Sequence, residues 1–382
     1  MKILFLIARY FPYSGLQTDF LRAAEAAADR GHDVTCLVGS WDGERPDKFR
    51  ILLAPLPGTG EADDLDALEA AYHELTERET FDRTAAFELI PGTDFYFAGF
   101  DCLGSAPENA DPRLLAREQA VFSPGSSTWI FYLVTPQINA FFGVYGTEAA
   151  RFLRLPPGMN PACGRVPDPD GVRIRKRAEL GLRDGERLCI TAAHDMLLKG
   201  VDRILTAYAG LPPERRARLR LFITGFLGRG KCEKLAAELG IADRAIFDGG
   251  RPDLPELLCA ADYLVHPARR EAAGSILIEA IASGLPVVCT DVCGFQDIVL
   301  ASGGHVLNEP FSPGTLTAEL DYLAGISDDG LYYWRQQVLA YAHGPADFYR
   351  RADVLVNFIQ SHGGGTRPGS GAIGSLPHGA RS

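Results

Sequence analysis

Short apolar runs alternate with amphipathic stretches along the first 150 or so residues. Ile3–Ala8 is a continuous apolar run typical of a buried strand. Apolar residues then recur at helical spacing from Leu16 to Ala28, and Gly31 ends that helix. The same reading predicts a helix at Asp64–Glu79 and strands at Val34–Val38, Phe95–Ala98 and Trp129–Val134.

The segment Leu155–Pro161 interrupts this alternation. Its three prolines and one glycine do not fit inside a regular element, so we expect a hinge between two domains there. The chain of 382 residues is also longer than a single hydrophobic core usually organises, which is about 250–300 residues.

The alternation resumes after the hinge. It predicts helices near Arg173–Leu180, from Val201 onward, and at Lys231–Leu239, Leu254–Ala260 and Gly274–Ala282. It predicts strands at Leu188–Ala192, Leu219–Thr224, Ala245–Phe247, Tyr263–Val265 and Pro286–Cys289. Strands that alternate with helices form parallel sheets, so the fold class is α/β with two doubly wound domains. Ligands bind such sheets at the carboxyl ends of the strands, and we expect a cleft between the domains.

The domain ranges follow from the hinge. Residues 1–158 form the N-terminal domain and residues 159–345 the C-terminal domain. A helix at Asp347–Gln360, within the segment 346–361, is expected to cross back to the N-terminal domain. Residues 362–382 are Gly, Ser, Pro and Arg with almost nothing apolar, which predicts a disordered tail.

Composition excludes several classes of protein. A net charge of −11 argues against non-specific binding to nucleic acid or anionic lipid. No apolar run approaches the roughly 18 residues that span a bilayer. The eight cysteines are scattered without zinc spacing, which indicates buried thiols in a reducing, cytoplasmic setting.

Two glutamates flank a predicted helix start in the C-terminal half. Glu271 precedes Gly274, where the chain turns into the helix, and Glu279 lies about one and a half turns inside it. A helix N-terminus presents free N–H groups that suit a diphosphate, and a carboxylate can accept both hydroxyls of a ribose. The alternative is a capping acid followed by a surface glutamate.

Basic residues and a glycine turn follow other predicted strands. Lys199 opens a helix after Leu188–Ala192 and could neutralise a pyrophosphate, or could simply be solvated. Arg251 stands before another helix. Gly15 follows the first strand and allows close backbone approach to a ligand, or a tight turn, with Asp19 a few residues into the helix.

Two local patterns resemble metal or nucleotide motifs without completing them. The loop Gly225–Lys231 nearly spells a P-loop, but Cys232 stands where Ser or Thr would hold magnesium. Asp64-Leu65-Asp66 lies at an acidic helix start, where it indicates helix charge and not a metal site. No histidines pair at metal-binding spacing, so we expect no metal.

Taken together, these residues resemble the GT-B glycosyltransferases of the large retaining family 4. Within it the chain is most similar to the lipopolysaccharide core glucosyltransferases that add glucose to inner-core heptose. The resemblance extends to about Gln360. It rests on Tyr10-Phe-Pro, Gly15-Leu-Gln, Asp19-Phe20, Gly31-His32, Pro91-Gly92, Leu155-Pro-Pro-Gly158, Lys199-Gly-Val-Asp-Arg203, His266-Pro-Ala268, Glu271-Ala-Ala-Gly274, Glu279-Ala280 and Gly284-Leu-Pro286.

The resemblance implies two Rossmann-like domains and a retaining, metal-independent hexosyltransferase without a cofactor, using a nucleotide sugar such as UDP-glucose. It implies that Glu279 binds the ribose hydroxyls and that Glu271 contacts the transferred sugar. It assigns further donor contacts to Gly15, Lys199, Arg251, Gly274, Ile276 and Leu277. Asp19 and Asp101 are candidate catalytic carboxylates on the acceptor side. The implied partners are a nucleotide sugar and a glycan or glycolipid acceptor, in the cytoplasm or peripherally at the inner face of the cell membrane.

The sequence departs from the family pattern in three places. Leu198 stands where the family usually has an arginine, with His194 or Arg229 as candidate substitutes. The glycine usual after the first C-terminal strand is replaced near Ala193. The stretch from Leu103 to Tyr132 has only two basic residues, which weakens the expectation of membrane docking by charge.

Three alternatives remain, of which the first two follow from these departures. The chain could act on an exopolysaccharide or another glycan acceptor. It could bind nucleotide sugars without catalysis. A nicotinamide oxidoreductase is a further alternative, although the glycine fingerprint of such enzymes is missing.

Overall fold

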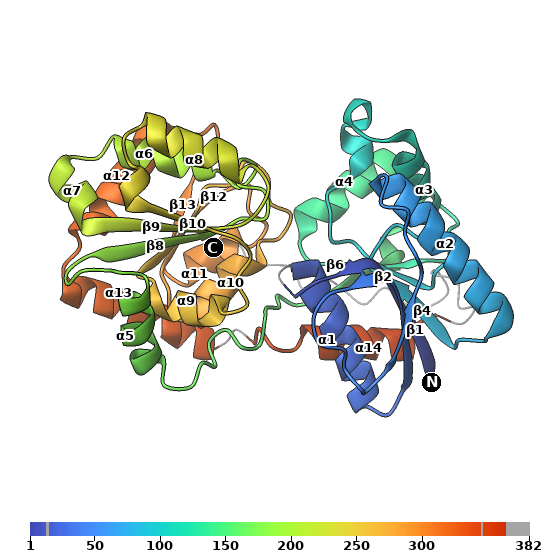
Figure 1. Cartoon of the computed structure of the whole chain (residues 1–382). Helices are drawn as coiled ribbons and strands as arrows, with labels where there is room; N and C mark the ends of the chain where they lie inside the picture. Colours follow the sequence, from blue (N-terminus) through green and yellow to red (C-terminus); the bar gives the residue numbers. More distant parts are fainter. Residues whose placement is uncertain (13–14, 345–346, 364–382) are drawn as a thin grey trace, which may run out of the picture. The chain divides into compact units, whose positions relative to one another are not determined.

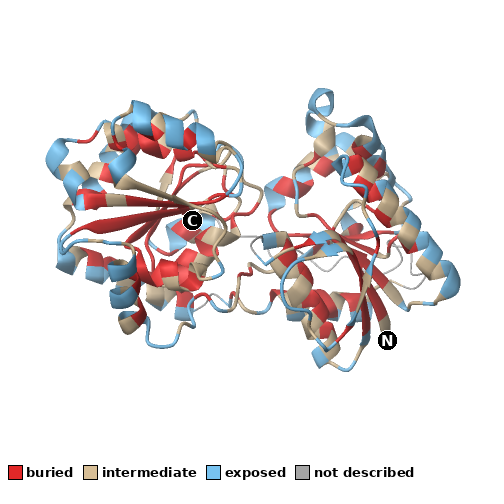
Figure 2. Ribbon diagram, in the orientation of Figure 1, coloured by how far each residue is buried: buried red, intermediate tan, exposed pale blue. Residues whose placement is uncertain are grey.

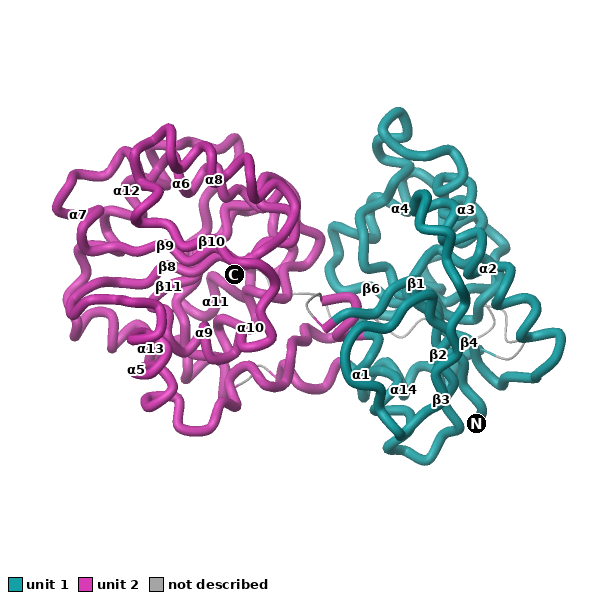
Figure 3. The backbone as a smooth tube through the Cα atoms, viewed as in Figure 1, with its two compact units in different colours: residues 1–11, 20–155, 352–382 teal, residues 12–19, 156–351 magenta. Residues whose placement is uncertain are grey.

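The computed structural model describes residues 1–12, 15–344 and 347–363. The chain divides into two compact units (Figure 3). Unit 1 comprises Met1–Phe11, Phe20–Leu155 and Ala352–Ser382, and unit 2 comprises Pro12–Asp19 and Pro156–Arg351. The division falls after Leu155, within the proline-rich segment. It differs from the expected ranges in grouping residues 12–19 with unit 2, where the Asp19 carboxylate accepts a hydrogen bond of 2.7 Å from Arg351.

Unit 1 is built on a seven-stranded sheet in the order β3-β2-β1-β4-β5-β6-β7. Each neighbouring pair in it is parallel. The strands are β1 (Lys2–Tyr10), β2 (Asp33–Trp41), β3 (Arg50–Leu53), β4 (Arg83–Ala86), β5 (Phe95–Phe97), β6 (Trp129–Tyr132) and β7 (Phe152–Arg154). The side chains of Ile3 to Ile7 are fully buried, because helices cover both faces of this sheet.

Helices α1 (Gly15–Asp29) and α14 (Arg351–Ser361) lie side by side on one face of this sheet (Figure 1). Arg30, just after α1, donates hydrogen bonds to Asp353 and Asn357 of α14, and Phe358 packs on Phe131 of β6. The other face carries α2 (Glu61–Arg78), α3 (Pro112–Phe122) and α4 (Thr135–Tyr145). Short 3-10 turns occur at Leu103–Ser105, Pro107–Asn109 and Ala149–Arg151.

Unit 2 is built on a six-stranded parallel sheet in the order β10-β9-β8-β11-β12-β13. Its strands are β8 (Arg187–Ala192), β9 (Leu219–Thr224), β10 (Ala245–Asp248), β11 (Tyr263–His266), β12 (Val287–Thr290) and β13 (His305–Leu307). The central strands are buried on both faces, as Figure 2 shows. Both sheets have the strand order of a doubly wound fold, which confirms the predicted fold class. The cleft expected between the domains stays a prediction.

The helices of unit 2 form two layers (Figure 1). One layer holds α6 (Val201–Ala209), α7 (Pro213–Arg218), α8 (Arg229–Glu238) and α12 (Pro313–Gly325). The other holds α5 (Pro169–Glu179), α9 (Leu254–Ala260), α10 (Ser275–Ala282), α11 (Gln296–Ala301) and α13 (Asp328–His343). A 3-10 turn at Ala242–Arg244 precedes β10.

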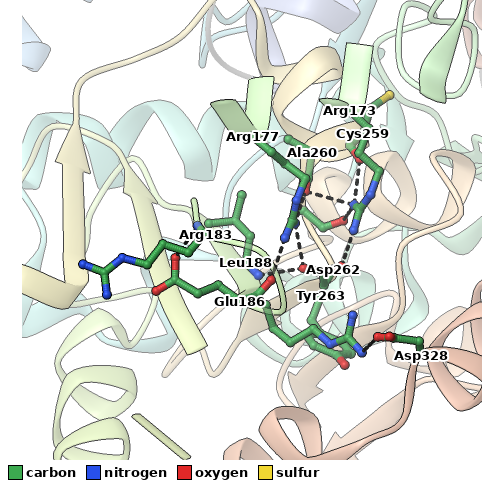
Figure 4. Close-up of polar contacts among 12 residues, drawn as sticks. Arg173, Arg177, Arg183, Glu186, Leu188, Cys259, Ala260, Asp262, Tyr263 and Asp328 are labelled. Carbon is green, nitrogen blue, oxygen red and sulfur yellow. Dashed lines mark hydrogen bonds and ion pairs between the residues drawn. The ribbon is translucent and has the colours of Figure 1, made fainter. Parts of the chain in front are cut away.

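A buried carboxylate ties α5 to the central strands of unit 2 (Figure 4). Asp262 is fully buried and accepts hydrogen bonds from Arg173 at 2.5 Å, from Arg177 at 3.0 Å and from the Leu188 backbone N–H at 2.7 Å. Burial alone would raise the pKa of Asp262, but the two guanidinium groups outweigh it and lower that pKa. The carboxylate therefore fixes the start of β8 to the start of β11.

The sheet order determines where a ligand can bind in unit 2. The chain leaves β8 toward β9 on one side and leaves β11 toward β12 on the other, so β8 and β11 are the neighbouring strands at which the winding reverses. A crevice forms outside the carboxyl ends of two such strands. The loops that follow them are 193–200, which contains Lys199, and 267–274, which contains Glu271.

Candidate functional site

Three polar side chains meet at the carboxyl ends of β8 and β11. Lys199 Nζ lies 2.8 Å from Glu271 Oε2, and His266 Nε2 lies 3.1 Å from the same oxygen. Lys199 also donates to the carbonyl oxygen of Arg270 at 3.2 Å. His266 is the last residue of β11, and Gly200, with φ of 76°, lets the loop turn into α6 against the carbonyl of Pro267. The sheet thus brings the predicted Lys199 and Glu271 into direct contact.

The charge of Glu271 is fixed by these neighbours. Burial raises the pKa of the carboxyl, but the hydrogen bond and charge of His266 and the Lys199 ammonium outweigh that effect and lower the pKa to about 2. Glu271 is therefore a carboxylate at neutral pH. The main chain of Glu271 pairs with that of Cys293 in a parallel backbone bridge. A Cβ atom added at Gly274 would lie 3.2 Å from Glu271 Cγ, so Gly274 packs closely against the Glu271 side chain.

Helix α10 carries the second glutamate of the motif. Gly274 adopts the left-handed conformation at φ of 90° and starts the helix, as the sequence predicts. Glu279 Oε1 accepts a hydrogen bond from the Asn160 backbone N–H at 3.2 Å. Burial is the main cause that raises the pKa of this carboxyl to about 7; the nearby Asp19 adds to it, while the Asn160 N–H and Arg351 oppose it. The two glutamates thus differ: Glu271 is ionised, whereas Glu279 titrates near neutrality.

The remaining α10 positions divide by exposure. Ile276 is partly exposed next to the helix start, whereas Leu277 is fully buried and packs beneath Gly274. A direct ligand contact from the Leu277 side chain does not fit that burial, and the Leu277 backbone N–H already donates to the Gly274 carbonyl at 3.0 Å. The N–H groups of Ser275 and Ile276 come before it in the first turn, where N–H groups have no partner within a regular helix, so these two are the ones that a ligand could reach.

Gly15 and Asp19 approach this region from the start of α1. A Cβ atom added at Gly15 would lie 3.5 Å from Ser275 Oγ, so the backbone of Gly15 lies close to the first residue of α10. Burial raises the pKa of Asp19, although its hydrogen-bonded partner Arg351 opposes this effect. Arg351 is itself buried and also donates to the Pro156 carbonyl at 3.0 Å. Asp19 is thus paired with a cation that the sequence did not predict.

Two further predicted residues follow strands other than β8 and β11. Arg251 follows β10, the edge strand, and pairs with Asp248 at 2.8 Å and with Asp253 at 2.7 Å. These two carboxylates raise the pKa of the Arg251 guanidinium. Asp101 follows β5 in unit 1, between that strand and the 3-10 turn Leu103–Ser105.

Known proteins match this chain in sequence. Residues 172–325 match the family model described as glycosyl transferases group 1. The chain is 36% identical over 332 residues to the lipopolysaccharide glucosyltransferase WaaG of Escherichia coli (strain K12), a match that covers 84% of this chain and 88% of that protein. The chain belongs to the group 1 glycosyltransferases. The retaining GT-B family predicted from the sequence is thereby confirmed.

Solved structures agree with this assignment. A crystal structure of WaaG, described as a glycosyltransferase involved in lipopolysaccharide biosynthesis, superposes with a TM-score of 0.89 at 33% identity, covering 94% of this chain and all of that one. Anabaena HepE in complex with UDP and glucose superposes with a TM-score of 0.74 at 17% identity, which shows the shared fold alone. A D-inositol 3-phosphate glycosyltransferase from Nocardia farcinica is 32% identical over 63% of this chain and 54% of its own.

The loop after β8 contains Leu198, where the resemblance implied an arginine. Leu198 lines a cavity of about 530 Å³ together with Lys231 and Arg269. Arg269 donates to the Leu197 carbonyl at 2.6 Å and pairs with Asp202 at 2.7 Å. Of the two substitutes considered from the sequence, Arg229 pairs with Glu233 at 2.7 Å, and His194 is exposed beside Phe226.

Sequence reasoning missed two groups near the carboxyl ends of the sheets. His266 was among the residues that carried the resemblance but was assigned no role, although its position at the end of an apolar strand, five residues before Glu271, was a usable signal. Glu88 follows β4 in unit 1, where burial raises the pKa of its carboxyl to about 8. Nothing in the local sequence distinguishes Glu88 from a surface acid.

Proposed function

We propose that this glycosyltransferase transfers a hexose, most simply glucose from UDP-glucose, to a heptose-type acceptor of a lipopolysaccharide core, with retention of the anomeric configuration. The observation that carries the proposal is the 36% identity to the E. coli lipopolysaccharide glucosyltransferase across 84% of the chain. The ion-paired Lys199 and Glu271 at the strand ends of unit 2 provide a matching chemical arrangement.

Unit 2 binds the donor in this proposal. The diphosphate lies against the free N–H groups at the start of α10, close to Gly15 and the Lys199 ammonium. Glu279 accepts hydrogen bonds from the ribose hydroxyls in its ionised form. Glu271 Oε2 is already held by Lys199 and His266, so Oε1 is the oxygen that accepts from the hydroxyls of the transferred sugar.

The reaction breaks the bond between the anomeric carbon and the diphosphate oxygen and forms a bond to the acceptor hydroxyl on the same face. The departing diphosphate takes the proton of that hydroxyl. Lys199 and the start of α10 stabilise the developing negative charge, which is the largest contribution that a protein makes to such a step. We propose that no metal and no cofactor are required, since these groups neutralise the diphosphate. Asp19 and Asp101 remain the candidate carboxylates for the acceptor.

A second candidate function is transfer to a glycan that is not anchored in a membrane. Arg113 and Arg117 are the only basic residues between Leu103 and Tyr132. Arg113 pairs with Asp63 at 2.7 Å, and Arg117 pairs with Glu69 at 2.7 Å and with Asp66. Their charges are therefore compensated by helix α2, which leaves little attraction for an anionic lipid surface.

No helix in the described part of the chain has the length and apolar character needed to cross a bilayer. We propose that the protein acts in the cytoplasm, with at most weak peripheral contact to the inner face of the membrane. Co-sedimentation with anionic vesicles at low and high salt separates the two acceptor classes: salt-sensitive binding favours the lipopolysaccharide acceptor, and its absence favours a soluble glycan.

The test of catalysis uses Glu271→Ala with Glu233→Ala as a matched control, because Glu233 forms an exposed ion pair on α8. Transfer of labelled sugar from UDP-glucose should fall by orders of magnitude in Glu271→Ala, while its circular dichroism and the activity of Glu233→Ala stay unchanged. Near-normal transfer by Glu271→Ala would contradict the proposed role.

A further inference from the structure

His266 lies at the carboxyl end of β11 in unit 2, and among the described residues its ring makes one hydrogen bond, to Glu271. It ends β11 and stands in register with Cys289 of β12, and its side chain is only 1% exposed. A histidine fixed in this way by a central strand has little freedom to move. Its position is therefore set by the sheet and not by a flexible loop.

The two oxygens of the Glu271 carboxylate have different environments. Oε2 receives both His266 Nε2 at 3.1 Å and Lys199 Nζ at 2.8 Å. Among the described residues, Oε1 has no hydrogen-bond partner. The carboxylate is thus held by one oxygen, which leaves the other available to a bound molecule.

The chemistry of the contact determines the tautomer of the histidine. A carboxylate only accepts hydrogen bonds, so Nε2 must carry the proton. Nδ1 is buried and has no partner in the part of the chain that the structure describes. The Nε2–H group is therefore the hydrogen-bond donor that the ring offers, and Glu271 Oε2 is its acceptor.

We infer that His266 is a positioning residue for sugar transfer: its Nε2–H orients the Glu271 carboxylate so that Oε1 faces the transferred sugar. This inference rests on the proposed function, in which Glu271 contacts that sugar. Lys199 alone could neutralise the charge of Glu271, but a flexible ammonium fixes direction poorly, whereas a ring on a rigid strand defines one orientation.

The experiment compares His266→Leu with His266→Gln, whose side-chain amide can still donate a hydrogen bond near the position of Nε2. The matched control is His305→Leu, because His305 also bonds a glutamate, Glu319, at 2.6 Å but on β13 and α12. We expect kcat to fall roughly 10- to 100-fold in His266→Leu, the range expected for a lost charge-assisted hydrogen bond, and to recover partly in His266→Gln. The affinity for UDP, which lacks the sugar, should stay unchanged, and His305→Leu should keep normal kcat.

A double-mutant cycle with Glu271→Gln tests whether His266 acts through Glu271. We expect His266→Leu to cost little more in that background, whereas fully additive losses, or a normal kcat in His266→Leu alone, would overturn the inference. If the wild-type chain turns over no nucleotide sugar, the proposed function fails. The contact itself is then still tested by NMR of isotope-labelled histidine, where protonation of His266 at Nδ1 instead of Nε2 would overturn it.

Discussion

Removal of the Asp262 carboxylate should destabilise unit 2 more than any exposed ion pair of that unit. Asp262 is fully buried and accepts from Arg173, Arg177 and the Leu188 N–H (Figure 4). In Asp262→Ala the N–H of Leu188 loses its acceptor inside the protein. Both arginines keep backbone carbonyl partners, those of Ala260 and Glu186 among them, but lose the charge that compensates theirs.

The expected loss follows from this geometry. Breaking a buried charged network by removing one partner costs about 3–5 kcal/mol. Asp262→Asn keeps an oxygen that can accept from Leu188, so its cost should be about 1.5–3 kcal/mol, the value of the lost charge assistance. For a unit of this size, each kcal/mol lowers Tm by about 2–4 °C, so Asp262→Ala should melt roughly 6–20 °C lower.

The assay must report on unit 2 alone. Trp334 lies in this unit, with its ring centroid 6.2 Å from that of Tyr263, the residue after Asp262. With Trp41 and Trp129 of unit 1 replaced by phenylalanine, tryptophan fluorescence follows the unfolding of unit 2. Glu233→Ala, which removes an exposed pair at 2.7 Å, is the control and should cost less than about 1 kcal/mol.

The pH dependence adds a second check with a defined sign. The pKa of Asp262 is lowered in the folded chain, so its contribution is present above the ordinary carboxyl value and is lost as pH falls through the folded value. The difference in stability between wild type and Asp262→Ala should therefore be constant from neutral pH down to about pH 5 and shrink in stronger acid. Equal stability of Asp262→Ala and Glu233→Ala at neutral pH would refute this reasoning.

Two further predictions concern donor binding. Because the pKa of Glu279 is raised to about 7, its carboxyl is protonated below that pH and ionised above it. KM for the nucleotide sugar should therefore rise as pH falls from 7.5 to 5.5 in initial-rate assays. A KM of Glu279→Gln that does not change with pH supports this, whereas the same change of KM with pH in both proteins contradicts it. Leu198→Arg should add the contact to the diphosphate that the resemblance implies, and lower the Kd for UDP by roughly tenfold or more in calorimetry, as a charge-assisted hydrogen bond would. An unchanged Kd would show that Arg269 or Lys231 already supplies that charge.

The fold of unit 2 could be predicted closely because its elements carry strong local signals. The strand Leu219–Thr224 and the helix Leu254–Ala260 are confirmed at the predicted residues. In unit 1 the prediction missed β3, β4 and β7, which have only three or four residues each. Strand β4, Arg83–Ala86, lies between β1 and β5, and its pairing with both neighbours, not its own sequence, makes it a strand. Helix α14 begins at Arg351, four residues after the predicted start at Asp347.

The candidate site could be predicted only in part. Lys199 and Glu271 were found because each follows a strand that ends at the crevice, and the structure places them in contact. The partners His266 and Arg351 were missed because they depend on tertiary contacts. Arg351 reaches Asp19 across more than 300 positions of sequence, which no local pattern encodes. The predicted tail, 362–382, lies almost entirely outside the described residues.

The central claim is that this chain catalyses sugar transfer from a nucleotide to a lipopolysaccharide core. The most direct measurement incubates the wild-type protein with labelled UDP-glucose and with lipopolysaccharide truncated at its inner-core heptose, and determines the anomeric configuration of the product by NMR. We predict an α-linked glucosyl product that does not form with Glu271→Ala. Binding of UDP in calorimetry without turnover of any sugar in a panel of UDP- and GDP-sugars would contradict the claim and indicate a nucleotide-sugar-binding protein.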